Sequence, residues 1–154
     1  AGLGLPGSAW NSRRRAGGSN APLATGNLVM IPLPPWMRTA LYATAVMNVL
    51  AAASFLPAGA PVRALVGLPE DGHPLYVATV AMFIFLFGLA YLWTAIVGRS
   101  DRLFIALAAG GKFSFFATLV CFWWIGSLPL RAPVLGSADL FFSVLFAIWL
   151  FGDA

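Results

Sequence analysis

The sequence predicts an all-α fold, an integral membrane four-helix bundle with both termini in the cytoplasm (N-in/C-in). Of its 154 residues, 60% are hydrophobic and 9% are charged, whereas charged residues make up about a quarter of an average soluble domain. Four apolar runs have about twenty residues each, enough at a rise of about 1.5 Å per residue to cross a bilayer core. The runs show no strand-like alternation, and open sheet edges cannot be hydrated in lipid, so helices are expected.

Residues 1–35 are predicted to form a flexible basic arm. They are rich in Gly, Ser and Pro and have no sustained apolar periodicity. The arm contains Arg13, Arg14 and Arg15, a cluster that suits contact with anionic lipid headgroups at about 1 kcal/mol per basic residue. Met30 opens the string MIPLPPWMR, a start typical of small membrane proteins. Residues 1–29 are therefore a candidate for an over-long start assignment.

The predicted bundle occupies residues 36–154. Its four spans are expected at about 37–56, 75–97, 103–126 and 133–152. Pro57 ends the first span, because proline cannot continue a helix beyond its first turn. Aromatic residues fall near span ends, where Trp and Tyr gather at membrane–water interfaces: Trp36, Tyr76, Trp123, Trp124 and Trp149.

The connection between the first and second spans is the longest. It holds a short apolar piece with helical character at 62–68, and then the string Pro69-Glu70-Asp71-Gly72-His73-Pro74. A metal site needs three or four fixed ligands. Three potential ligands within four residues, in a chain with one histidine, do not meet that need. We interpret the string as a solvated turn and predict no metal site.

Arginines indicate the orientation. Six lie on one side of the membrane, in the arm, at the start of the first span and in the second loop, and two lie in the first and third loops: Arg13, Arg14, Arg15, Arg38, Arg99 and Arg102 against Arg63 and Arg131. The positive-inside rule places the first group in the cytoplasm, although the count falls to three against two without residues 1–29. The predicted location is a bacterial inner membrane.

The basic residues also bear on partners. The net charge is +4, but most basic residues lie beside apolar segments, as topology determinants do, so no nucleic-acid partner is predicted. The expected partners are the lipid bilayer and other membrane subunits or further copies of the chain.

The single cysteine, Cys121, excludes an intrachain disulfide and a dithiol exchange mechanism.

Lys112 lies in the middle of the third span. A charge near the bilayer centre costs roughly 2.5–3.5 kcal/mol on insertion scales, so this residue needs a partner or a function. Depths counted at about 1.5 Å per residue place Lys112, Asp139, Asn48 and Tyr91 in one layer about 10 Å thick. We call these four residues the midplane layer. Lys112 and Asp139 are predicted to pair, because a short loop makes their helices antiparallel neighbours.

Small residues recur at every fourth position on three spans. Such stripes favour close helix packing in lipid, and they are expected to face inward with the polar residues. They are Ala40, Thr44, Asn48 and Ala52 on the first span, Ala106, Gly110, Ser114 and Thr118 on the third, and Asp139, Ser143 and Ala147 on the fourth.

Several strings in this chain resemble small, mostly uncharacterised bacterial four-helix membrane proteins of the DoxX-like kind. They are LVGLPEDGHPLY in the first loop, Gly-Lys-Phe in the third span and Ser-Ala-Asp-Leu-Phe-Phe in the fourth. Some members of that wider group are similar to subunits of quinone-linked sulfur oxidation, so the resemblance implies a quinone as a candidate ligand. The chain itself shows no separate cofactor motif. Small multidrug transporters need a glutamate in the first span, which this chain lacks.

Two functions are therefore open. The first is a non-enzymatic accessory or structural subunit of a membrane complex, in which the midplane layer neutralises itself and sets helix register. The second is a small redox-subunit or carrier-type protein that binds a quinone, a proton or a small polar solute at that layer. Intramembrane ionisable residues are found in both roles.

Overall fold

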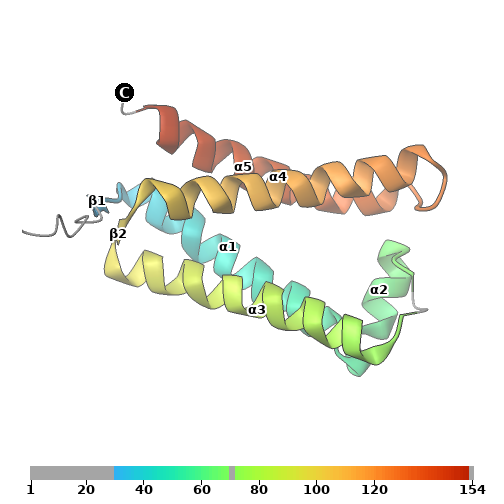
Figure 1. Cartoon of the computed structure of the whole chain (residues 1–154). Coiled ribbons are helices and arrows are strands. Elements are labelled where there is room, and N and C mark those ends of the chain that lie inside the picture. Colours follow the sequence, from blue (N-terminus) through green and yellow to red (C-terminus); the bar gives the residue numbers. More distant parts are fainter. Residues whose placement is uncertain (1–29, 70–71, 153–154) are drawn as a thin grey trace, which may run out of the picture.

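A computed structural model describes residues 30–69 and 72–152, and it is mostly helical (Figure 1). The predictions for residues 1–29 and for Glu70 and Asp71 concern residues outside the described ranges. The elements in chain order are β1 (Ile31–Pro32), α1 (Pro35–Ser54), the short 3-10 helix η1 (Pro57–Gly59), α2 (Ala60–Val66), α3 (Pro74–Val97), β2 (Arg99–Ser100), α4 (Arg102–Trp124) and α5 (Arg131–Gly152).

Three helices, α3, α4 and α5, are long and apolar enough to cross a membrane. The segment from α1 through α2 adds a fourth candidate if its two parts, which meet at 98°, form one span. This length and composition indicate an integral membrane protein. The helices begin and end within two residues of the predicted spans, and α1 stops at Ser54 because Pro57 cannot donate the next backbone hydrogen bond.

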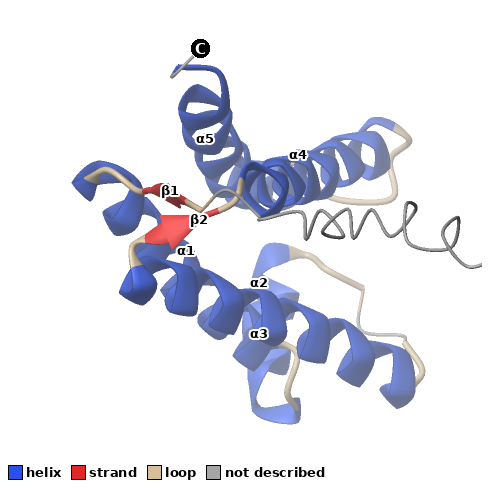
Figure 2. Cartoon of the chain, turned by 60° about the vertical axis from the view of Figure 1, so that its left-hand side comes forward, coloured by secondary structure: helices blue, strands red, loops and turns tan. Residues whose placement is uncertain are grey.

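The long helices form two pairs. α1 packs along α3, and α4 packs along α5, while a smaller contact between α1 and α5 joins the pairs. Figures 1 and 2 show the pairs lying close together where β1 and β2 meet and diverging toward α2. We call these the β-sheet end and the α2 end. α2 also contacts α5, so the pairs are connected at both ends.

The last residues of the predicted arm differ from the expectation, because they have regular structure. β1 pairs antiparallel with β2, with Ile31 opposite Ser100. The Leu33 amide donates to the carbonyl of Gly98 at 2.9 Å, and the Leu33 side chain is buried. The prediction of a flexible arm was therefore wrong for residues 31–35, which belong to β1, to the connection after it and to the start of α1.

The core lies where the helix pairs meet. The largest fully buried apolar side chains are Phe146, Met37, Leu41 and Ile105, one or more from each of α1, α4 and α5. Large apolar side chains elsewhere are mostly exposed in the isolated chain, such as Trp93 and Phe113. Exposed apolar side chains of this kind suit contact with lipid.

The small-residue stripes face inward on two helices and outward on the third. Those of α1 and α5 are buried or partly buried, but Ala106, Gly110, Ser114 and Thr118 of α4 are all exposed. The prediction for α4 was therefore wrong. Successive residues of a helix are separated by about 100°, so Gly110 and Ser114 lie about 200° from Lys112. The charge and the stripe cannot both face inward, and the buried face is the one that carries Lys112.

Candidate functional site: a polar network around Lys112

Lys112 and Asp139 form an ion pair between α4 and α5. The distance from Lys112 Nζ to Asp139 Oδ1 is 2.6 Å, and the side chains are 5% and 18% exposed. The loop between the helices is short, so the two residues lie at matching heights of an antiparallel pair. The opposite charges offset much of the cost of removing each from water.

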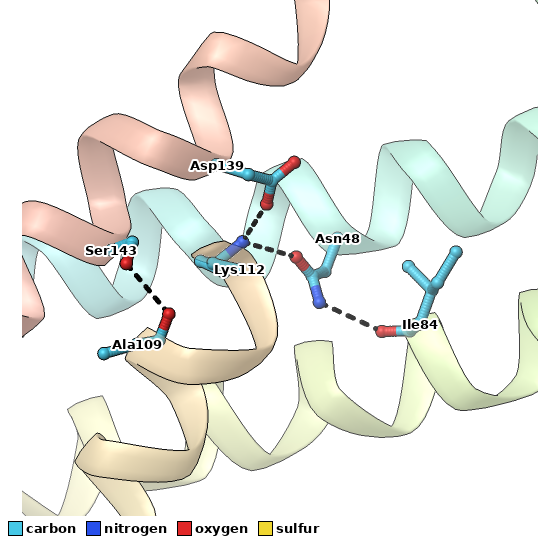
Figure 3. Close-up of polar contacts among 6 residues, drawn as sticks. All are labelled: Asn48, Ile84, Ala109, Lys112, Asp139 and Ser143. Carbon is cyan, nitrogen blue, oxygen red and sulfur yellow. Dashed lines mark hydrogen bonds and ion pairs between the residues drawn. The ribbon is translucent and has the colours of Figure 1, made fainter. Parts of the chain in front are cut away.

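Asn48 of α1 extends the ion pair to the other two long helices. Its Oδ1 accepts a hydrogen bond from Lys112 Nζ at 3.4 Å, and its Nδ2 donates to the carbonyl of Ile84 in α3 at 3.2 Å. Figure 3 shows the resulting chain of polar contacts across all four helices. Gly88 permits this approach, because a Cβ at Gly88 would lie 3.2 Å from the Cβ of Asn48.

Tyr91 contributes its ring to the surroundings of Lys112. Lys112 Nζ lies 5.7 Å from the centroid of the Tyr91 ring and 5.8 Å from that of Phe142. Both distances are within the range of cation–π attraction. The Tyr91 ring also packs near Phe104 and Phe146, with centroids 5.9 and 6.1 Å away. The structure thus brings all four residues of the midplane layer together.

Two further polar side chains lie on the same inward faces. The Ser143 hydroxyl donates to the carbonyl of Ala109 at 2.8 Å, which joins α5 to α4 beside the ion pair (Figure 3). The Thr44 hydroxyl lies one helical turn before Asn48 and is fully buried, and it has no hydrogen-bond partner among the described residues. A buried hydroxyl without a partner costs free energy. Among the described residues, the buried Trp149 Nε1 of α5 also has no hydrogen-bond partner.

The arrangement can do two things chemically. Lys112 is surrounded by a carboxylate, an amide oxygen and two aromatic rings, which together stabilise its positive charge. Asp139 uses Oδ1 for this pair, and its side chain retains some exposure. The network can therefore hold helices in register, and it can also accept a further hydrogen-bonding group at Asp139.

Two cavities lie away from this network. One of about 540 Å³ is lined by Leu33, Trp36 and Trp149, and one of about 270 Å³ by Trp93 and residues of β2. Both are at the β-sheet end, and none of the four midplane residues lines either cavity.

Four arginines have a role that the sequence reasoning missed. Each donates to a carbonyl at the C-terminal end of a helix, where the last four carbonyls lack partners within the helix. The pairs are Arg38 with Ala95 of α3, Arg63 with Ser54 and Leu56 at the end of α1, Arg131 with Ala64 of α2, and Arg102 with Leu150 of α5. The positive charge also suits the negative end of the helix dipole. The signal available in the sequence was the position of each arginine beside a span end.

The connection between α2 and α3 shows no group of potential metal ligands in the part that is described. His73 caps the start of α3, where its Nδ1 accepts a hydrogen bond from the amide of Leu75 at 3.2 Å. No group of three potential ligands occurs within residues 30–69 and 72–152. His73 thus has a structural role that its spacing from Glu70 and Asp71 did not indicate.

Comparisons of this chain with protein-family models, with curated proteins and with solved structures found no match.

Proposed function

We propose that this protein is a non-enzymatic accessory or structural subunit of a membrane complex, built as a four-span bundle with both termini in the cytoplasm. The observation that carries the proposal is the network from Asp139 through Lys112 and Asn48 to the carbonyl of Ile84. It includes a residue from each of the four long helices, α1, α3, α4 and α5.

The composition of the network supports a structural role. Lys112 is 5% exposed and engages two oxygen atoms and two aromatic rings. Within lipid, an isolated charge on one helix favours any arrangement that brings a partner to it. A single opposite charge in the partner helix thus selects one helix register. Buried polar groups are best known for setting register and partner choice.

The family resemblance agrees with this proposal. The DoxX-like group is a set of small four-helix membrane proteins, and Lys112 and Asp139 both lie in the strings that carry the resemblance, Gly-Lys-Phe and Ser-Ala-Asp-Leu-Phe-Phe. A bacterial inner membrane is the corresponding location.

A second candidate is a redox-subunit or carrier-type protein that binds a quinone, a proton or a small polar solute at the midplane layer. Two observations favour it. Thr44 presents a buried hydroxyl without a partner, and the Asp139 side chain is 18% exposed although its partner lysine is buried. A ligand with one donor and one acceptor would complement these two groups.

Purification of the full chain in a mild detergent separates the two functions. The measurements are the absorbance spectrum and the quinone content of the extracted lipids, quantified per polypeptide. A structural subunit is expected to show no bound chromophore and no stoichiometric quinone, and to migrate in native gels of gently solubilised membranes with a larger complex.

The control compares Lys112→Met with Ser114→Ala, a change on the exposed face of the same helix. A quinone bound at one per chain, retained in Ser114→Ala and lost in Lys112→Met, would refute the structural role and establish the ligand site.

A further inference from the structure

The two helix pairs are connected unequally along their length. At the β-sheet end they share the covalent link between α3 and α4, the pairing of β1 with β2 and the hydrogen bond from Leu33 to Gly98. Near the centre they share the bond between Lys112 and Asn48 and the packing of Tyr91 against Phe146.

At the α2 end, α2 connects the two pairs. α2 follows α1 in the chain and belongs to the α1–α3 pair, yet it contacts α5 of the other pair. Arg131 Nη2 donates to the carbonyl of Ala64 at 3.3 Å in an exposed position. Gly67, which ends α2, lies against Pro129 in the turn between α4 and α5.

Gly67 is closely fitted to this position. Its φ of +80° lies in the left-handed region, which side chains with a Cβ rarely adopt. A Cβ at Gly67 would collide with Pro129 Cγ and would lie 2.9 Å from Arg131 Nε. The backbone at the end of α2 therefore lies directly against the Pro129 and Arg131 side chains.

We propose that α2 is a strap that holds the two helix pairs together at the α2 end, and that its release lets them open about the two-stranded sheet at the other end. Gly98, between α3 and β2, has a φ of +69° and lies at this joint, where a residue without a Cβ can absorb a change in φ and ψ. The exposed hydrogen bond of Arg131 is weak because water competes for it, so the strap can detach without loss of the core. This inference concerns motion and is independent of the proposed function.

Distances between paired spin labels in lipid nanodiscs test the strap. The labels are placed on exposed residues of the two pairs, Leu75→Cys in α3 and Ile125→Cys at the end of α4, in a Cys121→Ser background. Gly67→Ala is expected to shift this distance to longer values and to broaden its distribution. A second label pair within one helix pair, Leu56→Cys with Leu75→Cys, is expected to remain unchanged.

Gly126→Ala is the matched control. Gly126 also has a positive φ, of +78°, and also follows a long helix at the α2 end, but a Cβ there meets nothing within 4 Å. The backbone strain is thus similar and the collision is absent, so the distance between residues 75 and 125 should not increase. An equal increase in both variants would overturn the proposal.

Arg131→Met provides an independent variant if Gly67→Ala does not fold. It removes the hydrogen bond to Ala64 and retains an unbranched side chain. The expected result is a broader distribution between residues 75 and 125 than in the unaltered chain. An unchanged distribution in Arg131→Met, or in a folded Gly67→Ala, would show that α2 does not restrain the helix pairs.

Discussion

Lys112 places a charge within an apolar helix, and the cost of that charge explains the residues around it. Asp139 supplies the opposite charge, Asn48 an oxygen, and Tyr91 and Phe142 their ring faces. Each of these groups comes from a different helix or a different turn of one helix. They therefore all reach the Lys112 ammonium group in only one arrangement of the helices. Burial of Lys112 also explains why the small-residue stripe of α4 is exposed: it lies on the opposite face of the helix.

The ion pair is expected to show strong coupling in a double-mutant cycle. Lys112→Met and Asp139→Leu should each lower the free energy of unfolding by on the order of 3 kcal/mol, since each leaves the other charge buried and unpaired. The double mutant should lose much less than the sum, because it leaves no charge behind. Unfolding of the purified protein in mixed detergent measures all four stabilities.

The control for this cycle pairs Lys112→Met with Asp101→Leu. Asp101 caps the start of α4, where its Oδ1 accepts a hydrogen bond from the amide of Phe104 at 2.7 Å. Asp101→Leu therefore removes a helix cap and leaves the contacts of Lys112 unchanged. These two losses should add. Additive losses for Lys112 and Asp139 as well would mean that their charges do not stabilise each other.

At the scale of the elements, helix ends are held by arginines from neighbouring segments. Arg38 of α1 reaches the end of α3, and Arg102 of α4 reaches the end of α5. Each contact lies within a helix pair and adds to the packing of small residues such as Gly88 against its partner helix. The pairs are therefore stabilised at their ends as well as along their faces.

Loss of such a cap should lower the stability of the protein more than the substitution of a neighbouring arginine that caps no helix. Arg38→Met removes the hydrogen bond from Nε to the Ala95 carbonyl, which is 3.0 Å long and partly buried. The expected loss is about 1.5–3 kcal/mol of unfolding free energy, typical of a hydrogen bond with a charged donor. Thermal unfolding in detergent is the measurement.

Arg99→Met is the matched control for the cap. Arg99 is exposed at the same end of the molecule, and its side chain makes no hydrogen bond within the described residues. Both changes remove one positive charge from the same side, so a difference in melting temperature isolates the cap. Equal melting temperatures of the Arg38→Met and Arg99→Met variants would show that the hydrogen bond of Arg38 does not stabilise the fold.

At the scale of the whole molecule, the arginines within residues 30–69 and 72–152 separate into two groups along the long axis. Arg38, Arg99 and Arg102 lie at the β-sheet end, and Arg63 and Arg131 at the α2 end. The proposed orientation places the β-sheet end in the cytoplasm. The strap of α2 then lies on the opposite surface.

Cysteine labelling on intact cells tests this orientation. In a Cys121→Ser background, Pro69→Cys at the α2 end should react with an impermeant thiol reagent, and Met30→Cys at the β-sheet end should react only after the cells are opened. Both positions are exposed in the structure, so access depends on the membrane side. The reverse pattern would place both termini outside.

The sequence by itself determined the class of this protein and the limits of its helices. Apolar runs of membrane length, interrupted by proline and glycine, leave few alternatives to helices in lipid. It also indicated the partner of Lys112, because one acidic residue lay at a matching depth on the adjacent helix. These inferences rest on composition and on spacing along one chain.

Tertiary structure decided which helix faces meet. The burial of Lys112 leaves the small-residue stripe of α4 exposed. The antiparallel pairing of β1 with β2 gives regular structure to residues 31–32, which the sequence placed in the predicted arm. The contact of Gly67 with Pro129 and the arginine caps join residues far apart in the chain. Such contacts depend on how helices rotate and cross, because side-chain packing and the pairing of buried charge act between elements rather than along them.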